Sequence, residues 1–122
     1  MKALLDTHVL LWALVDDPRL SAAQRAVLGA GELYVSAAAV WEVGIKRALG
    51  KLDVPGDVFE VAHASGVRQM PITWAHAEAA AALPAHHADP FDRMLIAQAV
   101  AEAMPLVSGD GKMARYAVEL IG

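Results

Sequence analysis

The sequence predicts an α/β fold in which a central parallel sheet lies between two layers of helices, a three-layer α/β/α sandwich. Short apolar segments alternate with segments of helical period along the chain, as parallel strands and crossover helices do. Two of the apolar segments lead into an aspartate, as buried strands do at the rim of a sheet. The length of 122 residues suits a single domain, 1–122.

The composition excludes several kinds of protein. Without cysteine, the chain has no disulfide, thiolate metal site or cysteine nucleophile. A net charge of −4 argues against a broad basic surface for nucleic acid, so a local patch and bound cations would have to attract one. The only basic cluster, either such a patch or a solvated helix face, is Lys46, Arg47 and Lys51. The hydrophobic content of 57% indicates an unusually complete core or apolar surface covered by a partner.

No segment has the features of a membrane span or an export signal. The longest apolar run, Val9–Val15, is far shorter than the roughly 18 residues that a transmembrane helix needs. Asp6 and His8 interrupt the apolar stretch near the N-terminus, and no small-residue cleavage site follows, which argues against a secretory signal. We therefore expect a cytoplasmic protein with no membrane association.

The first half of the chain is predicted to form two strands and four helices. A strand over 3–5 ends at Asp6, and the next strand covers 33–36. Ser21 and Gln24 have the spacing of a capping box, which begins a helix that runs to Gly29. The other helices are expected over 7–15, 37–49 and 56–65, the second of them ended by Gly50.

The second half is predicted to continue the alternation. Thr73 caps an alanine-rich helix that ends near Pro84, and a loop over 85–88 follows. Asp89 and Pro90 then open a helix with an acceptor at the cap and proline in the first turn. Short strands are expected over 70–72, 104–108 and 118–121, with a helical segment over 112–116.

Among the fourteen acidic residues, position selects four candidates for a metal site. Asp6 terminates an apolar strand, although it is also placed to cap the following helix. Glu42 lies among apolar residues, where a buried charge is costly without a partner, although Lys46 four residues later could supply an ordinary helix ion pair. Asp92 in a first helical turn and Asp110 between two glycines also have simple structural explanations.

The four carboxylates are more informative together. Two follow strands, and two lie on helices that can pass the same edge of the sheet. Crowded carboxylates repel one another, so either some are protonated or a hard cation neutralises them. Oxygen ligands alone favour Mg²⁺ or Mn²⁺, which suit phosphoryl chemistry.

Four sequence blocks resemble the PIN-domain ribonucleases, and most closely the VapC-type toxins of prokaryotic type II toxin–antitoxin pairs. The blocks occur in the order and spacing of that family and span nearly the whole chain. They are Leu4-Leu5-Asp6-Thr7-His8, Ser36 to Lys46 with Trp41-Glu42, His87 to Arg93 leading into Leu95-Ile96-Ala97-Gln98-Ala99, and Leu106 to Asp110.

The resemblance implies a set of site residues. Carried over position by position, the family's acidic residues fall on Asp6, Glu42, Asp92 and Asp110, as metal ligands and catalytic groups. Thr7 and Ser108 match hydroxyl positions beside them, and Asp89 either joins the site or caps its helix. Arg93 is expected to meet substrate phosphate, hold a carboxylate or lie on the surface at a helix start. We expect neither His86 nor His87 to bind metal, because adjacent histidines face different directions and both lie in a loop.

The resemblance also implies a function. A PIN nuclease hydrolyses RNA phosphodiester bonds with Mg²⁺ or Mn²⁺ and leaves a 5′-phosphate and a 3′-hydroxyl, without a covalent intermediate. Relatives of this size commonly form homodimers and are silenced by a VapB-type antitoxin that covers the acidic site.

Two other functions compete with this interpretation. A haloacid-dehalogenase-like phosphatase needs an aspartate two residues after its nucleophile, where this chain has His8, and a phospho-accepting receiver domain needs an early acidic pair that is lacking here. The other alternative is a catalytically silent PIN-fold module that binds RNA or protein, which the loss of an acidic position would have favoured.

Overall fold

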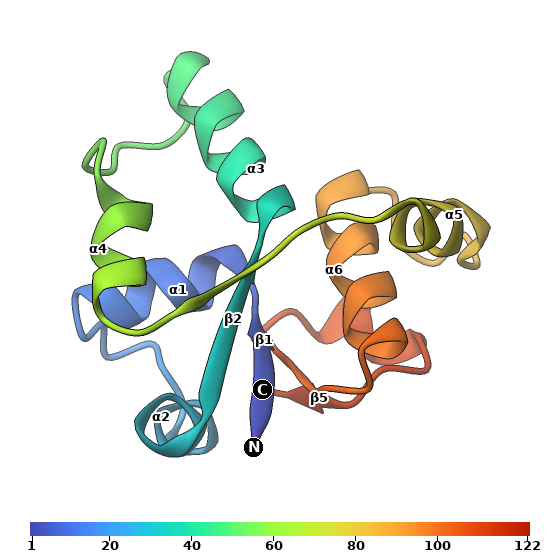
Figure 1. Ribbon diagram of the computed structural model, residues 1–122, viewed down its shortest axis with the longest axis horizontal. Coiled ribbons are helices and arrows are strands. Elements are labelled where there is room, and N and C mark those ends of the chain that lie inside the picture. Colours follow the sequence, from blue (N-terminus) through green and yellow to red (C-terminus); the bar gives the residue numbers. More distant parts are fainter.

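A parallel sheet of five strands forms the centre of the computed structural model, which describes residues 1–122 (Figure 1). The strands are β1 (Lys2–Leu5), β2 (Glu32–Ser36), β3 (Arg68–Met70), β4 (Leu106–Val107) and β5 (Leu120–Ile121). Their order in space is β3-β2-β1-β4-β5. The chain thus builds outward from β1 through β2 and β3, and then crosses to the other side of β1 to add β4 and β5. In open α/β sheets, ligands bind where the strand order reverses in this way.

Helices cover both faces of the sheet, which confirms the predicted three-layer architecture. They are α1 (Thr7–Leu14), α2 (Ala22–Ala30), α3 (Ala37–Ala48), α4 (Val58–Ala64), α5 (Trp74–Ala82), α6 (Pro90–Ala101) and the short 3₁₀ helix η1 (Gly111–Arg115). Figure 1 shows α1, α2 and α4 on one side of the sheet and α5 and α6 on the other. None of these helices has the length and apolar character needed to cross a bilayer.

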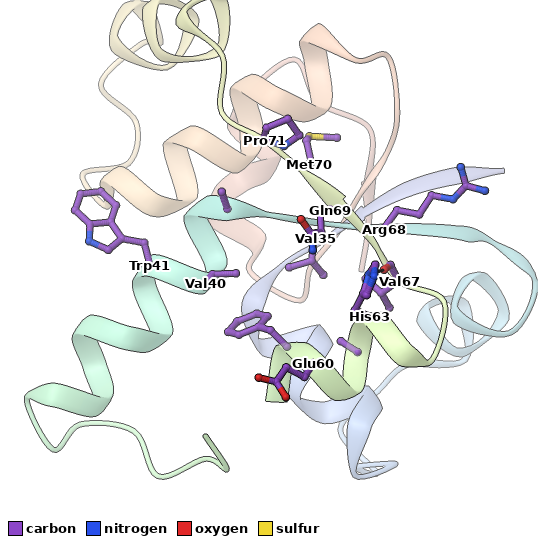
Figure 2. A pocket seen from close by; sticks show the side chains of 13 residues that line it. Val35, Val40, Trp41, Glu60, His63, Val67, Arg68, Gln69, Met70 and Pro71 are labelled. Carbon is purple, nitrogen blue, oxygen red and sulfur yellow. Dashed lines mark hydrogen bonds between the residues drawn. The ribbon is translucent and has the colours of Figure 1, made fainter. Parts of the chain in front are cut away.

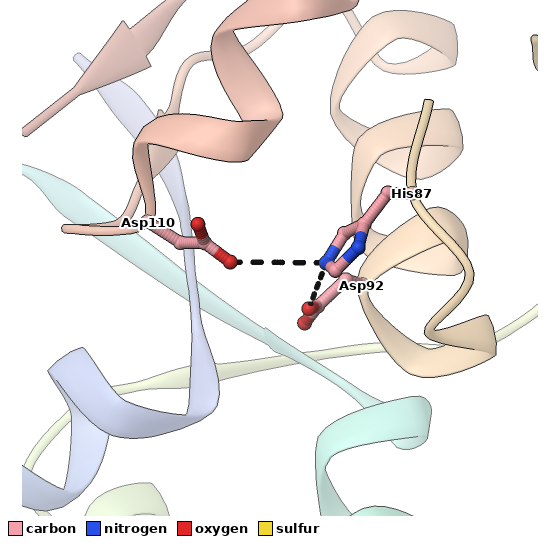
Figure 3. Close-up of side chains that lie close together, drawn as sticks. All are labelled: His87, Asp92 and Asp110. Carbon is pink, nitrogen blue, oxygen red and sulfur yellow. Dashed lines mark hydrogen bonds and ion pairs between the residues drawn. The ribbon is translucent and has the colours of Figure 1, made fainter. Parts of the chain in front are cut away.

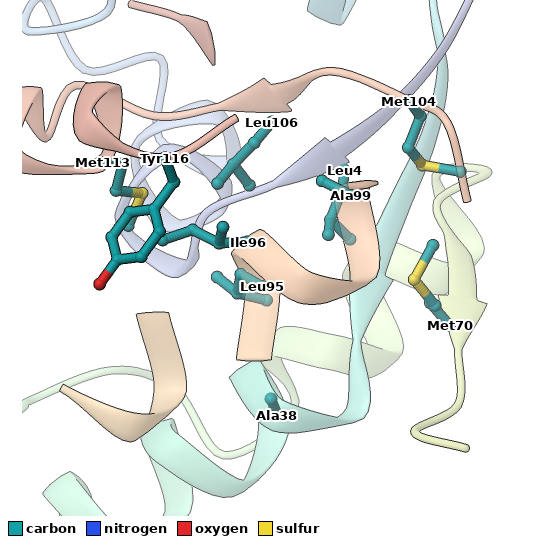
Figure 4. Packing of buried hydrophobic residues seen from close by; sticks show 10 residues of the cluster. All are labelled: Leu4, Ala38, Met70, Leu95, Ile96, Ala99, Met104, Leu106, Met113 and Tyr116. Atoms are coloured by element: carbon teal, nitrogen blue, oxygen red, sulfur yellow. The ribbon is translucent and has the colours of Figure 1, made fainter. Parts of the chain in front are cut away.

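Two apolar cores lie on the two faces of the sheet, because neighbouring residues of a strand point to opposite faces. Leu4 belongs to the core under α6, whereas Ala3 and Leu5 belong to the core under α1 and α4. Figure 4 shows the first core, in which Leu95, Ile96 and Ala99 of α6 pack on β1 and β4. The members that α3, β3 and the segments around β4 contribute to it are Ala38, Met70, Met104, Leu106, Met113 and Tyr116.

Several local predictions are confirmed by the hydrogen bonds at the helix ends. The Ser21 hydroxyl accepts from the backbone N–H of Gln24, and the Gln24 side chain accepts from the N–H of Ser21, so the predicted capping box is present. Thr73 caps α5 in the same manner, with His76 as its partner. Gly50 follows α3 with a φ of +69°, a conformation that glycine adopts without strain.

Other predictions need correction at the level of single residues. The strand expected over 70–72 lies at Arg68–Met70, because Pro71 has no N–H to donate to a neighbouring strand. The helical segment expected over 112–116 is the 3₁₀ helix Gly111–Arg115. The predicted cluster of basic residues on one helix is divided, since α3 ends at Ala48 and Lys51 lies beyond it.

Candidate metal centre

The four acidic candidates come from four different elements that meet at the carboxyl edge of the sheet. Asp6 follows β1, and Asp110 comes shortly after β4, so both lie where the strand order reverses. Glu42 is in α3, and Asp92 is in the first turn of α6, which packs against α3, β1 and β4. Burial is the main cause of the raised pKa values of Asp6 and Asp92, and a smaller rise comes from the negative charge of Glu42 at Asp6 and of Asp6 at Asp92. The fold therefore brings Asp6 within electrostatic reach of both Glu42 and Asp92.

The Asp6 side chain faces the site rather than the helix that it precedes. Asp6 occupies the N-cap position of α1, but its carboxylate makes no capping hydrogen bond. It accepts instead from the hydroxyl of buried Ser108, at 2.7 Å. Burial raises the pKa of the Asp6 carboxyl, and the hydrogen bond from Ser108 opposes that rise. The sequence left two explanations open for Asp6, a helix cap and a metal ligand. The structure shows no side-chain cap, so the first explanation does not hold.

Glu42 is buried and makes two short hydrogen bonds. One carboxylate oxygen accepts from the hydroxyl of Thr7 at 2.7 Å, and the other accepts from the ammonium of Lys46, also at 2.7 Å. The predicted i,i+4 ion pair is thus present. Because nearby Asp89 and Asp92 also raise the pKa of Lys46, this cation lies within the field of the acidic cluster as a whole. A role for Glu42 in metal binding stays a prediction.

Asp92 has the most strongly perturbed carboxyl of the cluster. Desolvation by burial raises its pKa to about 6, and the negative charges of Asp89 and Asp6 add to that rise. A 2.7 Å hydrogen bond between Asp92 Oδ2 and Nε2 of His87 acts in the opposite direction. A positive charge near this carboxyl would stabilise its ionised form, because it would offset both the desolvation and the repulsion from neighbouring carboxylates.

His87 lies beside the acidic cluster, although we expected neither loop histidine to bind metal. Its Nε2 atom also lies 3.7 Å from Oδ2 of Asp110, so the imidazole stands between two carboxylates (Figure 3). His86 faces elsewhere and packs its ring against Tyr116, with centroids 5.2 Å apart. Adjacent histidines do point in different directions, as expected, but one of those directions leads into the site. The position of His87 beside the Asp89-to-Asp92 block was the signal available in the sequence.

Asp89 and Asp110 both serve as caps in the structure. Oδ1 of Asp89 accepts from the backbone N–H groups of Phe91 at 2.8 Å and Asp92 at 3.2 Å, so the capping explanation holds for this residue. Oδ1 of Asp110 accepts from the N–H of Lys112 at 3.0 Å and thereby begins η1. The second oxygen of Asp110 is the one directed toward His87, so capping leaves that oxygen available to the site.

Arg93 makes no hydrogen bond or ion pair with a carboxylate, so the structure does not support the carboxylate-holding role considered for it, and a contact with substrate phosphate stays a prediction. Its guanidinium donates to the backbone carbonyl oxygens of the segment between α5 and α6 and of the last turns of α5. The acceptors are those of Ala80, Leu83, Pro84 and His87, at 2.9 to 3.3 Å. It also lies 3.4 Å from the hydroxyl of Tyr116. Arg93 thus holds the loop that carries His87.

The donor set fits a hard divalent cation. His87, Asp92 and Asp110 each offer one ligand atom, and these three atoms all lie within 4.8 Å of one another. Asp6 and Glu42 add carboxylate oxygens nearby, each supported by a hydroxyl donor. Carboxylate oxygens are the preferred ligands of Mg²⁺ and Mn²⁺.

A groove lies beside α3, and none of the four acidic candidates lines it. It has a volume of about 890 Å³ and runs between α3, α4 and the edge strand β3 (Figure 2). Its lining is mainly apolar and includes Val40, Trp41 and Phe59. The Trp41 ring also packs on Phe91 at the start of α6, with centroids 5.4 Å apart.

Comparisons with known proteins find similarity over the whole chain. The sequence model of the PIN domain matches residues 3–119. A structure of VapBC2 from Rickettsia felis bound to a DNA fragment from its promoter is similar over 98% of this chain and 97% of that chain, with a TM-score of 0.71 and 14% identity. No curated protein matches the sequence.

Two further solved structures have the same fold. A toxin–antitoxin complex from Klebsiella pneumoniae is similar over 98% of this chain and 96% of that chain, with a TM-score of 0.68 and 18% identity. FitAcB from Neisseria gonorrhoeae is similar over the same shares, with a TM-score of 0.65 and 20% identity.

Proposed function

The chain belongs to the PIN domain family, and on this premise we propose that it is a Mg²⁺- or Mn²⁺-dependent endoribonuclease that acts as the toxin of a toxin–antitoxin pair. PIN domains are generally nucleases, which use divalent metal ions. The observation that supports the proposal most strongly is the convergence of Asp6, Glu42, Asp92 and Asp110 from four elements at the reversal point of the sheet. We propose these four carboxylates as the metal ligands.

The protein side chains would bind and orient the groups that react. Thr7 and Ser108 hold the carboxylates of Glu42 and Asp6 in fixed positions by hydrogen bonds of 2.7 Å, which reduces the cost of organising a metal site. A divalent cation, when bound, lowers the pKa of water and stabilises negative charge in the transition state. Hydrolysis forms the bond between the water oxygen and phosphorus, breaks the bond from phosphorus to the 3′ oxygen and leaves a proton on that oxygen. The products are a 5′-phosphate and a 3′-hydroxyl.

An antitoxin partner and a homodimer are parts of the same proposal. The solved structures with this fold include VapBC2, a toxin–antitoxin complex and FitAcB, although identities of 14 to 20% establish the likeness of fold alone. The exposed apolar side chains also support a protein partner, since Trp74 is 90% exposed and Trp41 65%. We propose a VapB-type antitoxin as that partner.

The test is to incubate purified protein, freed of any bound antitoxin, with total cellular RNA and to map the new 5′ ends. Cleavage is expected with Mg²⁺ or Mn²⁺ and is expected to disappear in excess EDTA. New ends should carry a 5′-phosphate. RNA that stays intact under all metal conditions would favour the alternative, a catalytically silent PIN-fold module that binds RNA or protein. Full cleavage in EDTA would contradict the metal-dependent mechanism.

A further inference from the structure

We infer that His87 is a nitrogen ligand of the divalent cation, beside Asp92 and Asp110. The inference rests on the proposed function and adds to its all-carboxylate ligand set. It begins from the position of the imidazole, whose Nε2 atom is 2.7 Å from Asp92 Oδ2 and 3.7 Å from Asp110 Oδ2 (Figure 3).

These distances suit atoms that share one ion. Ligand atoms in adjacent positions of an octahedron lie about 3 Å apart when each is roughly 2.1 Å from the metal. The two observed separations fall on either side of that value. A cation between the three side chains would therefore need only small side-chain adjustments, and it would replace the direct contact between His87 and Asp92.

The backbone of His87 is held in place by residues outside the acidic cluster. Its N–H donates to the hydroxyl of Tyr116 at 2.8 Å, and its carbonyl oxygen accepts from Arg93 at 3.3 Å. Tyr116 is buried and donates in turn to the carbonyl oxygen of Pro84 at 2.8 Å. The loop is thus fixed from both sides, so little conformational entropy opposes metal binding by this side chain.

A nitrogen ligand has a consequence for the choice of metal. Imidazole suits transition-metal ions, whereas Mg²⁺ favours oxygen ligands and water. With His87 in its ligand set, the protein should bind Mn²⁺ in preference to Mg²⁺, and removal of the imidazole should reduce that preference.

The test compares the full-length parent with His87→Gln and with a matched control, His86→Gln. The control makes the same change at the neighbouring histidine, which is exposed and faces Tyr116 rather than the carboxylates. Mn²⁺ affinity is measured from the electron paramagnetic resonance signal of the free ion, with Mg²⁺ as competitor. Pulsed measurements on bound Mn²⁺ then detect a coupled ¹⁴N nucleus directly. Thermal midpoints in EDTA show whether each variant is folded.

The parent and His86→Gln are expected to bind Mn²⁺ with an imidazole ¹⁴N coupling. In His87→Gln, the coupling should disappear, and Mn²⁺ affinity should fall by at least about tenfold, since even loss of an outer partner of a ligand costs that much. Its affinity for Mg²⁺ should fall less. Parent protein that binds Mn²⁺ without ¹⁴N coupling, and equally well after His87→Gln, would overturn the inference while leaving the proposed function intact. Failure of the parent to bind either ion would overturn both.

Discussion

At the scale of single residues, the raised pKa of Asp92 has a consequence for stability. Its carboxyl has a pKa of about 6 in the folded protein and a reference value of 3.8, so the folded state binds more protons than the unfolded state between these pH values. Stability must therefore fall as pH rises through this window. In metal-free protein, we expect unfolding to require about 1–3 kcal/mol more at pH 4 than at pH 7 on account of this group.

The measurement is urea unfolding of the parent and of Asp92→Asn in EDTA at several pH values. The variant lacks the titrating carboxyl, so the difference in stability between the two proteins should change across the window. Relative to the parent, Asp92→Asn should have a higher free energy of unfolding at pH 7 than at pH 4. A difference that stays constant with pH would mean that the carboxyl titrates alike in the folded and unfolded chains.

Asp89 and Asp92 are three residues apart in one motif, but the structure gives them different surroundings. Asp89 caps α6, and asparagine caps about as well as aspartate, so Asp89→Asn should keep the fold and most of the cleavage activity. Asp92→Asn should keep the fold but lower metal-dependent cleavage by orders of magnitude. Cleavage rates are measured against Mg²⁺ concentration for both variants. An active Asp92→Asn beside an inactive Asp89→Asn would transfer the proposed ligand role to Asp89.

The sequence selects the acidic candidates by their positions, whereas it does not show the arrangement of their partners. Asp6 is marked by its place after an apolar strand, and Glu42 by its apolar neighbours. His87 is only five residues from Asp92, but its approach depends on how the loop before α6 folds back. That fold is fixed in part by Tyr116, which is 29 residues further along the chain, and no local pattern encodes this contact.

At the scale of elements, Arg93 links the end of α5 to the loop before α6 through several carbonyl oxygens. Lysine keeps the charge but lacks the two-armed guanidinium, so Arg93→Lys should lower the free energy of unfolding by about 2 kcal/mol. Arg47→Lys, at an exposed position of α3, makes the same change and should have an effect within about 0.5 kcal/mol. Urea unfolding compares the two. Equal stability of both variants would show that the loop does not depend on Arg93.

Helix starts could be predicted because their signals lie in neighbouring residues. Strand bounds were less accurate because they depend on pairing with other strands. The capping box at Ser21 and Gln24, and the Asp89-Pro90 helix start, depend on neighbouring residues and were found. The strand predicted over 70–72 lies two residues too late in the chain. The position of β3 is set by its pairing with β2, which a local apolar run does not encode. The same reason explains β4, which covers Leu106–Val107 and is shorter than the strand predicted over 104–108.

At the scale of the whole molecule, the strand order produces the site. Since β2 and β3 lie on one side of β1, and β4 and β5 on the other, the strand order reverses between β1 and β4, and ligands of open α/β sheets bind at the carboxyl ends of strands at such a point. Alternation of strands and helices predicted a parallel sheet, but it does not state where the order reverses. The positions of Asp6 and Asp110 after two predicted strands indicated which strand ends meet at the site.

The proposed toxin role leads to a prediction for the intact protein in cells. Expression of the chain alone should slow growth, and co-expression with the small protein encoded beside its gene should restore it. Growth curves with induced and uninduced cultures measure this effect. Unimpaired growth with abundant intact protein would contradict the toxin role, although it would leave a nuclease activity possible.

If the clustered carboxylates carry out metal-dependent RNA cleavage, Asp6→Asn should abolish it. Asparagine preserves an oxygen that can accept from Ser108, and it removes a buried charge, so the variant should be as stable as the parent or more stable without metal. The control is Asp53→Asn, the same change at an exposed carboxylate between α3 and α4.

The measurement is the single-turnover rate of cleavage of one defined RNA in saturating Mg²⁺, with thermal midpoints taken on the same samples. We expect Asp53→Asn to cleave like the parent, while folded Asp6→Asn loses cleavage by orders of magnitude. Folded Asp6→Asn that cleaves at the rate of the parent would contradict this expectation.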